Sequence, residues 1–243
     1  MKKDGTILWL TGWGMPSFIW DSWQQSLTEY YHVAVDFSQM ASPSAIYKGV
    51  EEIYRGIQQE IPSPILVVGW SLGGMLAQRL AATFPVQGLL LLNTTARFVR
   101  DEAEIHLGWP TTSLIRMKRS VKKSRYKVLE RFYTSMFPES EKELSHQSST
   151  TLLQQCNWTE NALLAGLDIL LLEDCRPLLS HINCPCLLIH SFNDPVIPYA
   201  AAQEMAESIP NATFISPDYQ GHYPFVTGSS YVVNEIRRFI RAK

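Results

Sequence analysis

The chain of 243 residues lacks the features that define several classes of protein. It has only four cysteines, and Cys184 and Cys186 are too close together to suggest a disulfide framework. We therefore expect Cys156, Cys175, Cys184 and Cys186 to be reduced core residues. No histidine and cysteine cluster has zinc spacing, and no glycine-rich loop has a phosphate-binding pattern. The sequence predicts neither a metal ion nor an organic cofactor.

Long hydrophobic runs are also missing. The apolar run Ile7–Leu10 is shorter than the roughly 7–15 residues of a secretory signal, and no small-residue cleavage site follows it. No window reaches the ~20 apolar residues of a membrane span. The formal net charge of -2 gives no overall attraction to nucleic acid or to a membrane. We expect a soluble cytoplasmic protein with neither kind of partner.

The residues that are present indicate one α/β domain. Hydrophobic residues make up 46% of the chain, enough for a sizeable core. Short, continuous apolar runs alternate with helical patterns, which predicts a mostly parallel, doubly wound sheet of about six strands. The expected strands are Ile7–Leu10, Val33–Val35, Ile65–Val68, Leu89–Leu92, Cys186–Ile189 and Thr213–Ile215. The expected helices are Ala45–Glu60, Leu72–Phe84, Tyr199–Ser208 and Ser229–Arg241.

One segment interrupts this alternation. Residues 96–176 have a mostly helical pattern without a convincing strand. We interpret this segment as a helical cap inserted between the fourth and fifth strands. The predicted organisation is a core formed by residues 1–95 and 177–243 and a cap formed by residues 96–176.

The strongest local motif is Gly69-Trp70-Ser71-Leu72-Gly73, a G-x-S-x-G pattern. An apolar strand precedes it and helix-forming residues follow, which is the setting of a sharp turn between strand and helix. The glycines leave room for a strained backbone that lifts the Ser71 hydroxyl above the sheet. Ser71 is therefore the candidate nucleophile. The alternative is an ordinary glycine-rich turn.

A serine nucleophile needs a base, and after this kind of turn the acid and then the histidine follow in the chain. Asp194 comes just after the strand Cys186–Ile189, where catalytic groups gather at the carboxyl ends of parallel strands. Asn193-Asp194-Pro195 could also form a simple turn. Asp168 and Asp174 are weaker candidates, because both lie in the cap segment.

His222 is the candidate base, because it alone among the histidines has the required order and a loop position after the last expected strand. The alternative is an ordinary loop histidine. We interpret His32 and His190 as half-buried structural residues at strand ends. The remaining three are expected at the surface, in or beside the cap: His106, His146 and His181.

Ester or amide chemistry also requires donors for the oxyanion. One is the backbone N–H of Leu72, which follows the nucleophile. The second is expected from the turn Thr11-Gly12-Trp13-Gly14 after the first strand, and we select the Trp13 N–H. A turn without a catalytic role is the alternative.

Together these segments resemble the α/β-hydrolase superfamily over the whole chain. The closer resemblance is to the pimeloyl-[acyl-carrier protein] methyl ester esterases of biotin synthesis. Besides the motifs above, it is carried by Trp20, Gly74, Leu129-Glu130-Arg131-Phe132, Gly166-Leu167-Asp168-Ile169-Leu170, Val196-Ile197-Pro198 and Pro224-Phe225.

Three departures from the superfamily pattern stand out. Most relatives have a histidine where this chain has Thr11, which weakens the support of the oxyanion turn. The segment Asp36-Phe37-Ser38-Gln39-Met40 lacks the glycines of the usual Asp-x-Pro-Gly-x-Gly loop. The N-terminal antiparallel strands of many relatives are expected to be missing. None of these changes removes Ser71, Asp194 or His222.

The resemblance implies a carboxylic ester hydrolase that cleaves the methyl ester of a pimeloyl group on an acyl carrier protein. Three alternatives remain open. One is a different hydrolysis on the same fold, of a thioester or a carbon–carbon bond. Another is an acyltransferase or lyase that uses the same residues. The third is a non-catalytic binding protein with a hydrolase-like fold.

The cap segment is strongly basic between residues 113 and 137. It contains eight basic residues and one acidic residue, a local charge of +7 in a chain of net charge -2. On a continuous helix, Arg119, Lys123, Lys127 and Arg131 would form one stripe, opposite an apolar face. The stripe is either a solvated helix face or a docking surface for an acidic partner. The resemblance favours acyl carrier protein, above all at Lys127 and Arg131.

Overall fold

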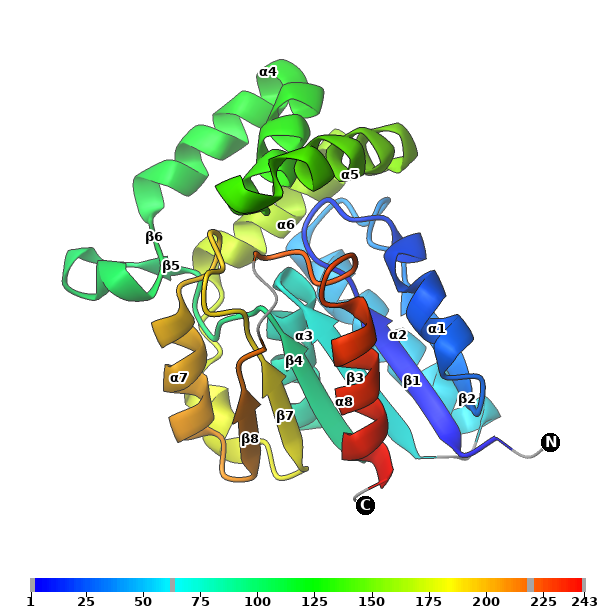
Figure 1. The fold of residues 1–243 in the computed structure, drawn as a ribbon. Helices are drawn as coiled ribbons and strands as arrows, with labels where there is room; N and C mark the ends of the chain where they lie inside the picture. Colours follow the sequence, from blue (N-terminus) through cyan, green and yellow to red (C-terminus); the bar gives the residue numbers. More distant parts are fainter. Residues whose placement is uncertain (1–2, 62–63, 218–220, 242–243) are drawn as a thin grey trace.

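The computed structural model describes residues 3–61, 64–217 and 221–241 of the chain. A six-stranded sheet forms its centre, with the strand order β2-β1-β3-β4-β7-β8 (Figure 1). Every neighbouring pair in this sheet is parallel. The strands are β1 (Gly5–Leu10), β2 (Tyr30–Val35), β3 (Ile65–Trp70), β4 (Gly88–Leu92), β7 (Cys186–Ile189) and β8 (Ala212–Ile215).

All six strands expected from the sequence are therefore confirmed, together with the parallel sheet. The residues of β1, β3, β4 and β7 are buried throughout, as a sheet covered by helices on both faces requires. Leu8 lies opposite Val33 of β2 on one side and Val67 of β3 on the other. The register brings the carboxyl ends of the strands to one edge, where the candidate site lies.

Helices cover both faces of the sheet. Figure 1 shows α1 (Asp21–Ser26) and α8 (Ser229–Arg241) in front of it, and α2 (Pro43–Glu60) and α3 (Leu72–Thr83) behind it. Helix α2 begins where the Ser42 Oγ accepts a hydrogen bond from the Ala45 N–H, with Pro43 in the first turn. A short 3-10 helix, η1 (Ser17–Trp20), precedes α1, and α7 (Tyr199–Ser208) links β7 to β8.

The segment between β4 and β7 lies above the carboxyl ends of the strands (Figure 1). Two short strands in this segment were not predicted, because two residues are too few to show a periodic pattern. They form a parallel pair between Val99 and Trp109 and between Arg100 and Pro110. The elements of this segment are β5 (Val99–Arg100), η2 (Glu102–Leu107), β6 (Trp109–Pro110), α4 (Thr111–Ser135), η3 (Glu139–Glu141), α5 (Lys142–Gln155) and α6 (Glu160–Leu172), followed by η4 (Arg176–His181). The division into a core of residues 1–95 and 177–243 and a cap of residues 96–176 stays a prediction.

Helix α4 is not continuous, so the single basic stripe expected from the sequence is wrong. Ser124 has an extended backbone, with φ -164° and ψ 94°, and its Oγ accepts a hydrogen bond from the Lys127 N–H at 3.4 Å. This is the arrangement of a helix N-cap, and it starts a second helical arm. Figure 1 shows the two arms of α4 turning at the far end of the molecule. Arg119 and Lys123 lie on the first arm, and Lys127 and Arg131 on the second.

None of the described helices is long and apolar enough to cross a membrane. None of the four cysteines forms a disulfide bond within the described residues. Cys175 and Cys186 are buried, as expected of core residues, but Cys156 and Cys184 are only half-buried.

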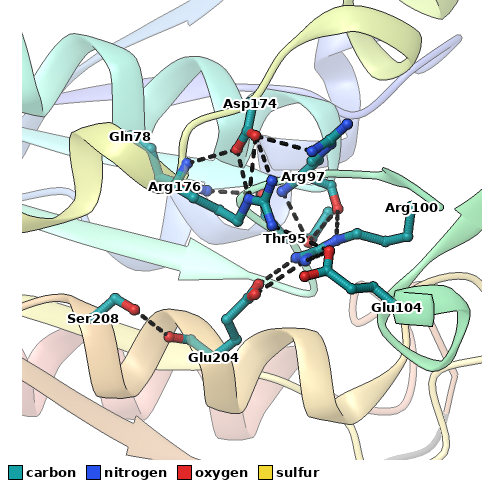
Figure 2. Close-up of polar contacts among 9 residues, drawn as sticks. All are labelled: Gln78, Thr95, Arg97, Arg100, Glu104, Asp174, Arg176, Glu204 and Ser208. Carbon is teal, nitrogen blue, oxygen red and sulfur yellow. Dashed lines mark hydrogen bonds and ion pairs between the residues drawn. The ribbon is translucent and has the colours of Figure 1, made fainter.

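A network of ion pairs joins the two ends of the cap segment to the core (Figure 2). The Arg100 side chain is fully buried and donates hydrogen bonds to Glu104 in η2 and to Glu204 in α7. At the other end of the segment, Asp174 accepts hydrogen bonds from Arg97 at 3.2 Å and Arg176 at 2.7 Å. Arg176 also donates to Glu104 at 3.2 Å, so one network holds both ends.

This network predicts that Arg100→Met destabilises the protein. The substitution keeps most of the aliphatic volume but leaves two carboxylates without their shared cation. Because Glu104 and Glu204 are partly exposed, water offsets part of the loss, and we expect the free energy of unfolding to fall by roughly 1–3 kcal/mol. Urea denaturation would measure it. Lys142→Met, which breaks an exposed ion pair with Glu139, is the control and should leave the urea midpoint unchanged. Equal losses in the two variants would contradict a structural role for the network.

Candidate active site

Ser71 occupies a strained turn between β3 and α3. Its φ of 55° and ψ of -122° lie in a region that side chains rarely adopt. The first residues of α3 pack closely against the end of β1. A Cβ atom at Gly73 would lie 2.1 Å from the Leu10 carbonyl oxygen, so only glycine fits there. This packing fixes the hydroxyl of Ser71 at the carboxyl edge of the sheet.

The three residues singled out from the sequence form one chain of hydrogen bonds. The Ser71 Oγ lies 3.0 Å from His222 Nε2, and His222 Nδ1 lies 2.7 Å from Asp194 Oδ2. The side chains of His222 and Asp194 are fully buried, and Ser71 is 6% exposed. A hydroxyl, an imidazole and a carboxylate in this order can move a proton from the serine to the histidine.

The loop that carries His222 is held from two directions. The His222 N–H donates to the Met136 carbonyl at the end of α4, at 2.7 Å. The Trp70 indole N–H, beside the nucleophile, donates to the His222 carbonyl at 2.9 Å. Gly221 has a φ of 91°, so a residue with a side chain would be strained there. These contacts fix the imidazole between Ser71 and Asp194.

Asp194 has a hydrogen-bond donor on each side of its carboxylate. Oδ1 accepts from the backbone N–H groups of Val196 at 2.8 Å and Ile197 at 2.9 Å. Oδ2 accepts from the Asn93 side-chain amide at 2.9 Å as well as bonding to His222. Burial raises the pKa of the Asp194 carboxyl, but attraction to His222 and the bonds from His222 and Asn93 more than offset it. The net pKa lies below the ordinary value, so the carboxylate stays ionised.

Two contributors to this environment were not recognised from the sequence. Asn93 directly follows the buried strand β4 at the carboxyl edge, and its position there is the only sequence signal for this role. Its φ is 41°, and its amide also donates to the Gly221 carbonyl at 3.3 Å. His190 is fully buried rather than half-buried. Its Nε2 lies 3.0 Å from the Ile197 carbonyl oxygen and 3.6 Å from Asp194 Oδ2, and burial lowers its pKa.

The alternative acids and histidines lie elsewhere. Asp168 pairs with Lys118 on α4, and Asp174 belongs to the ion-pair network. His32 is half-buried at the edge of the sheet, where its Nδ1 accepts from the Trp9 indole at 3.2 Å. The three histidines expected at the surface are exposed: His106, His146 and His181.

The two residues whose amides are expected to bind an oxyanion, Trp13 and Leu72, belong to segments next to Ser71. Leu72 is the first residue of α3, where the helix itself provides no acceptor for the N–H. The turn that carries Trp13 lies against the nucleophile, because a Cβ at Gly12 would be 3.2 Å from the Ser71 Cβ. Their role in catalysis stays a prediction.

Residues of the cap segment hold the turn that carries Trp13. The Tyr133 hydroxyl donates to the Gly14 carbonyl at 2.5 Å, and the Trp158 indole N–H donates to the Met15 carbonyl at 2.9 Å. The Trp13 indole N–H in turn donates to the Leu163 carbonyl of α6 at 2.8 Å. Thr11 contributes no such support, since its buried hydroxyl has no hydrogen-bond partner among the described residues.

The basic residues of α4 differ in their contacts. Lys118 pairs with Asp168, and the Arg125 guanidinium donates to the Trp158 carbonyl at 2.9 Å. The four candidate docking residues are all exposed: Arg119, Lys123, Lys127 and Arg131. Within the described ranges, no group of three or more His, Cys, Asp or Glu side chains is arranged to hold a metal ion.

Comparison with known proteins identifies the family of this chain. Residues 7–234 match a family model described as "Alpha/beta hydrolase family". The chain belongs to the alpha/beta hydrolase family. This confirms the resemblance and the fold class inferred from the sequence.

Curated relatives of this hydrolase carry a more specific name. This chain is 32% identical over 227 residues to the pimeloyl-[acyl-carrier protein] methyl ester esterase of Nitrosomonas europaea, with 91% of this chain and 90% of that protein covered. It is 30% identical to the protein of the same name from Chromobacterium violaceum, with 91% and 88% covered. A bromoperoxidase from Bacillus anthracis has the same fold, with a TM-score of 0.85 at 17% identity over 99% of this chain and 93% of that one.

The contact between Asn93 and Asp194 predicts a role in positioning the carboxylate of this hydrolase. Asn93→Gly keeps the positive φ without strain but removes the amide donor, and Asn93→Ala removes the donor and adds strain. Because a hydrogen bond to a charged group is worth roughly 1.5–3 kcal/mol, we expect kcat to fall by about tenfold or more in both variants. Steady-state kinetics on an ester substrate would measure this.

Two further readouts separate this role from a purely structural one. Loss of a donor raises the pKa of Asp194, so the acid limb of the kcat profile should move to higher pH in both variants. The melting temperature should fall further in Asn93→Ala than in Asn93→Gly. A Gly variant with the kcat and pH profile of the unsubstituted protein would mean that Asn93 only shapes the backbone.

Proposed function

We propose that this hydrolase is a serine esterase with Ser71 as nucleophile, His222 as general base and Asp194 as the orienting acid. The observation that supports this most directly is the hydrogen-bonded chain from Ser71 Oγ through His222 to Asp194, with separations of 3.0 and 2.7 Å. The ionised state of Asp194 favours a positive charge on His222 as it accepts the serine proton.

In the first half of the reaction, Ser71 Oγ attacks the ester carbonyl carbon while its proton moves to His222 Nε2. The carbonyl oxygen becomes an oxyanion that the N–H groups of Trp13 and Leu72 bind. The tetrahedral intermediate then collapses, the bond to the alcohol oxygen breaks, and His222 gives its proton to the departing alcohol. An acyl group remains on Ser71.

Water completes the cycle. His222 takes a proton from a water molecule, whose oxygen attacks the acyl carbonyl, and the same two amides bind the second oxyanion. The bond to Ser71 Oγ breaks as His222 returns a proton to it, and the carboxylic acid product leaves. These steps use only side chains and amides of this chain together with water.

The substrate we propose is the methyl ester of a pimeloyl group bound to an acyl carrier protein, which places the enzyme in biotin synthesis. Its support is the name shared by the relatives from Nitrosomonas europaea and Chromobacterium violaceum, which cover about nine-tenths of the chain. A basic cap surface suits an acidic carrier. Growth of a strain that lacks the biotin-pathway methyl esterase, when it expresses this chain, would test the assignment. Failure to restore growth despite soluble protein would count against it.

The proposed triad predicts large and unequal effects of two substitutions. Ser71→Ala should lower kcat by roughly 10⁴–10⁶, because the acyl-enzyme can no longer form. Asp194→Asn should lower kcat by about 10⁴ while KM changes little, because the imidazole tautomer is no longer fixed. Steady-state hydrolysis of a small methyl ester would measure both. Asp168→Asn is the control and should keep normal turnover. Near-normal activity of folded Ser71→Ala would exclude Ser71 as the nucleophile.

The basic arms of α4 predict a selective loss on the carrier-bound substrate. Because Arg119, Lys123, Lys127 and Arg131 are exposed, each contact is worth ~0.2–1 kcal/mol, and the attraction acts mainly on the association rate. We expect Lys123→Glu with Lys127→Glu to lower kcat/KM on a carrier-bound methyl ester by about tenfold or more at low salt. The difference from the unsubstituted enzyme should shrink as salt shortens the Debye length from ~10 Å at 0.1 M to ~3 Å at 1 M.

A small neutral methyl ester is the internal control for this charge reversal. Its kcat/KM should stay unchanged, because the triad is untouched. Equal losses on both substrates would mean that the cap is damaged. No loss on either would mean that these lysines belong to an ordinary solvated helix face.

A further inference from the structure

The turn that carries Trp13 has the features of a type II β-turn. The Met15 N–H donates to the Gly12 carbonyl at 3.3 Å, and Gly14, the third residue of the turn, has a φ of 69°. In a trans peptide the C=O and the N–H point in opposite directions. The bond that draws the Gly12 carbonyl into the turn therefore directs the Trp13 N–H outward. The direction of this proposed oxyanion donor thus depends on the conformation of the turn.

Gly14 does not hold this conformation by itself. Glycine adopts positive and negative φ with similar ease, so contacts from outside the turn are needed to keep Gly14 at 69°. The residue before the turn, Thr11, does not supply them, because its buried hydroxyl has no hydrogen-bond partner within the described ranges. The contacts come from the cap segment instead.

Tyr133 makes the cap contact that acts directly on this glycine. Its hydroxyl donates to the Gly14 carbonyl at 2.5 Å. Cys156 Sγ lies 3.4 Å from the same oxygen, but a thiol is a weak donor. The two other cap bonds to the turn involve the Met15 carbonyl and the Trp13 indole, so neither fixes the Gly14 carbonyl. Tyr133 therefore supplies the main hydrogen bond to this carbonyl.

The packing around Tyr133 fixes its hydroxyl in place. The side chain is fully buried on the second arm of α4. This arm packs directly on the turn, because a Cβ atom at Gly14 would lie 2.8 Å from Leu129 Cδ2. Burial raises the pKa of the Tyr133 hydroxyl well above its ordinary value, so the hydroxyl keeps its proton and stays a donor throughout the pH range of an assay.

We propose that Tyr133 is a positioning residue for oxyanion binding. Its bond to the Gly14 carbonyl holds the turn in the conformation in which the Trp13 N–H can receive the oxyanion. The inference rests on the proposed esterase function and deepens it, since a residue of the cap then stabilises the transition state through the turn.

The test compares Tyr133→Phe with Tyr54→Phe. Both variants delete one hydroxyl from a fully buried tyrosine that donates to a backbone carbonyl, and Tyr54 does so on α2, to Pro85. On a small methyl ester, we expect Tyr133→Phe to lower kcat/KM by about tenfold. Loss of a complete oxyanion donor costs roughly 10²–10³ in kcat, and here the donor is only less well directed. Tyr54→Phe should change kcat/KM by less than about twofold.

Two inhibitors separate positioning from a general loss of structure. A boronic acid adds to the Ser71 Oγ and gives a tetrahedral adduct that resembles the transition state, whereas the N-methyl amide with the same acyl chain keeps a planar carbonyl. In Tyr133→Phe the boronic acid should bind about tenfold more weakly, in step with kcat/KM, and the amide should change by less than about twofold. Equal weakening of both inhibitors, an equal loss in Tyr54→Phe, or an unchanged kcat/KM would overturn the proposal.

Hydrogen exchange tests the turn without any reaction. The Met15 amide proton, which bonds to the Gly12 carbonyl, should exchange about tenfold faster in Tyr133→Phe and at an unchanged rate in Tyr54→Phe. Faster exchange together with no ester hydrolysis by the unsubstituted protein would reject the esterase but keep the role of Tyr133 in holding the turn. Unchanged exchange would overturn that role, whether or not the protein hydrolyses esters.

Discussion

The close contact between the start of α3 and the end of β1 determines the rest of the site. Gly73 lies so near the Leu10 carbonyl that no side chain fits between them. Two residues before Gly73, Ser71 has a strained backbone, and the turn of Gly12 and Trp13 lies against the Ser71 side chain. Strain of about 1–3 kcal/mol at one residue persists only where surrounding packing holds it. Here the fully buried strands β1 and β3 supply that packing.

Much of this arrangement could be predicted from the sequence, because it depends on local patterns. Continuous apolar runs indicated all six strands, and the turn glycines indicated the strained serine. Asp194 and His222 could be proposed because each follows a strand whose carboxyl end reaches the same edge. Asn93 follows a strand in the same way, but asparagine at a strand end more commonly forms a turn than supports a catalytic carboxylate. Only the parallel register of β4 beside β7 brings its amide to the Asp194 carboxylate.

The cap segment was less predictable for a related reason. A run of basic residues at helical spacing suggested one straight helix, and residues 111–135 are indeed almost all helical. The N-cap at Ser124 is a single hydroxyl, and serine occurs within many helices without ending them. Its effect comes from tertiary packing, since Leu129 and Tyr133 of the second arm are buried and Tyr133 bonds to Gly14. The direction of each arm therefore follows from contacts with the core that sequence periodicity does not encode.

The ion-pair network has a consequence for how this fold can vary. Because Arg97 pairs with Asp174, and Arg176 with Glu104, the two ends of the cap segment leave the core side by side. A segment whose ends already meet can be lengthened at little entropic cost to the core, because closure of a longer loop costs only about 0.6 kcal/mol for each doubling of its length. The core should therefore tolerate a different cap segment inserted between the same two adjacent chain ends. Such a cap would need its own hydrogen-bond donors for the Gly14 and Met15 carbonyls. Only caps that keep these donors would preserve the conformation of the turn beside Ser71.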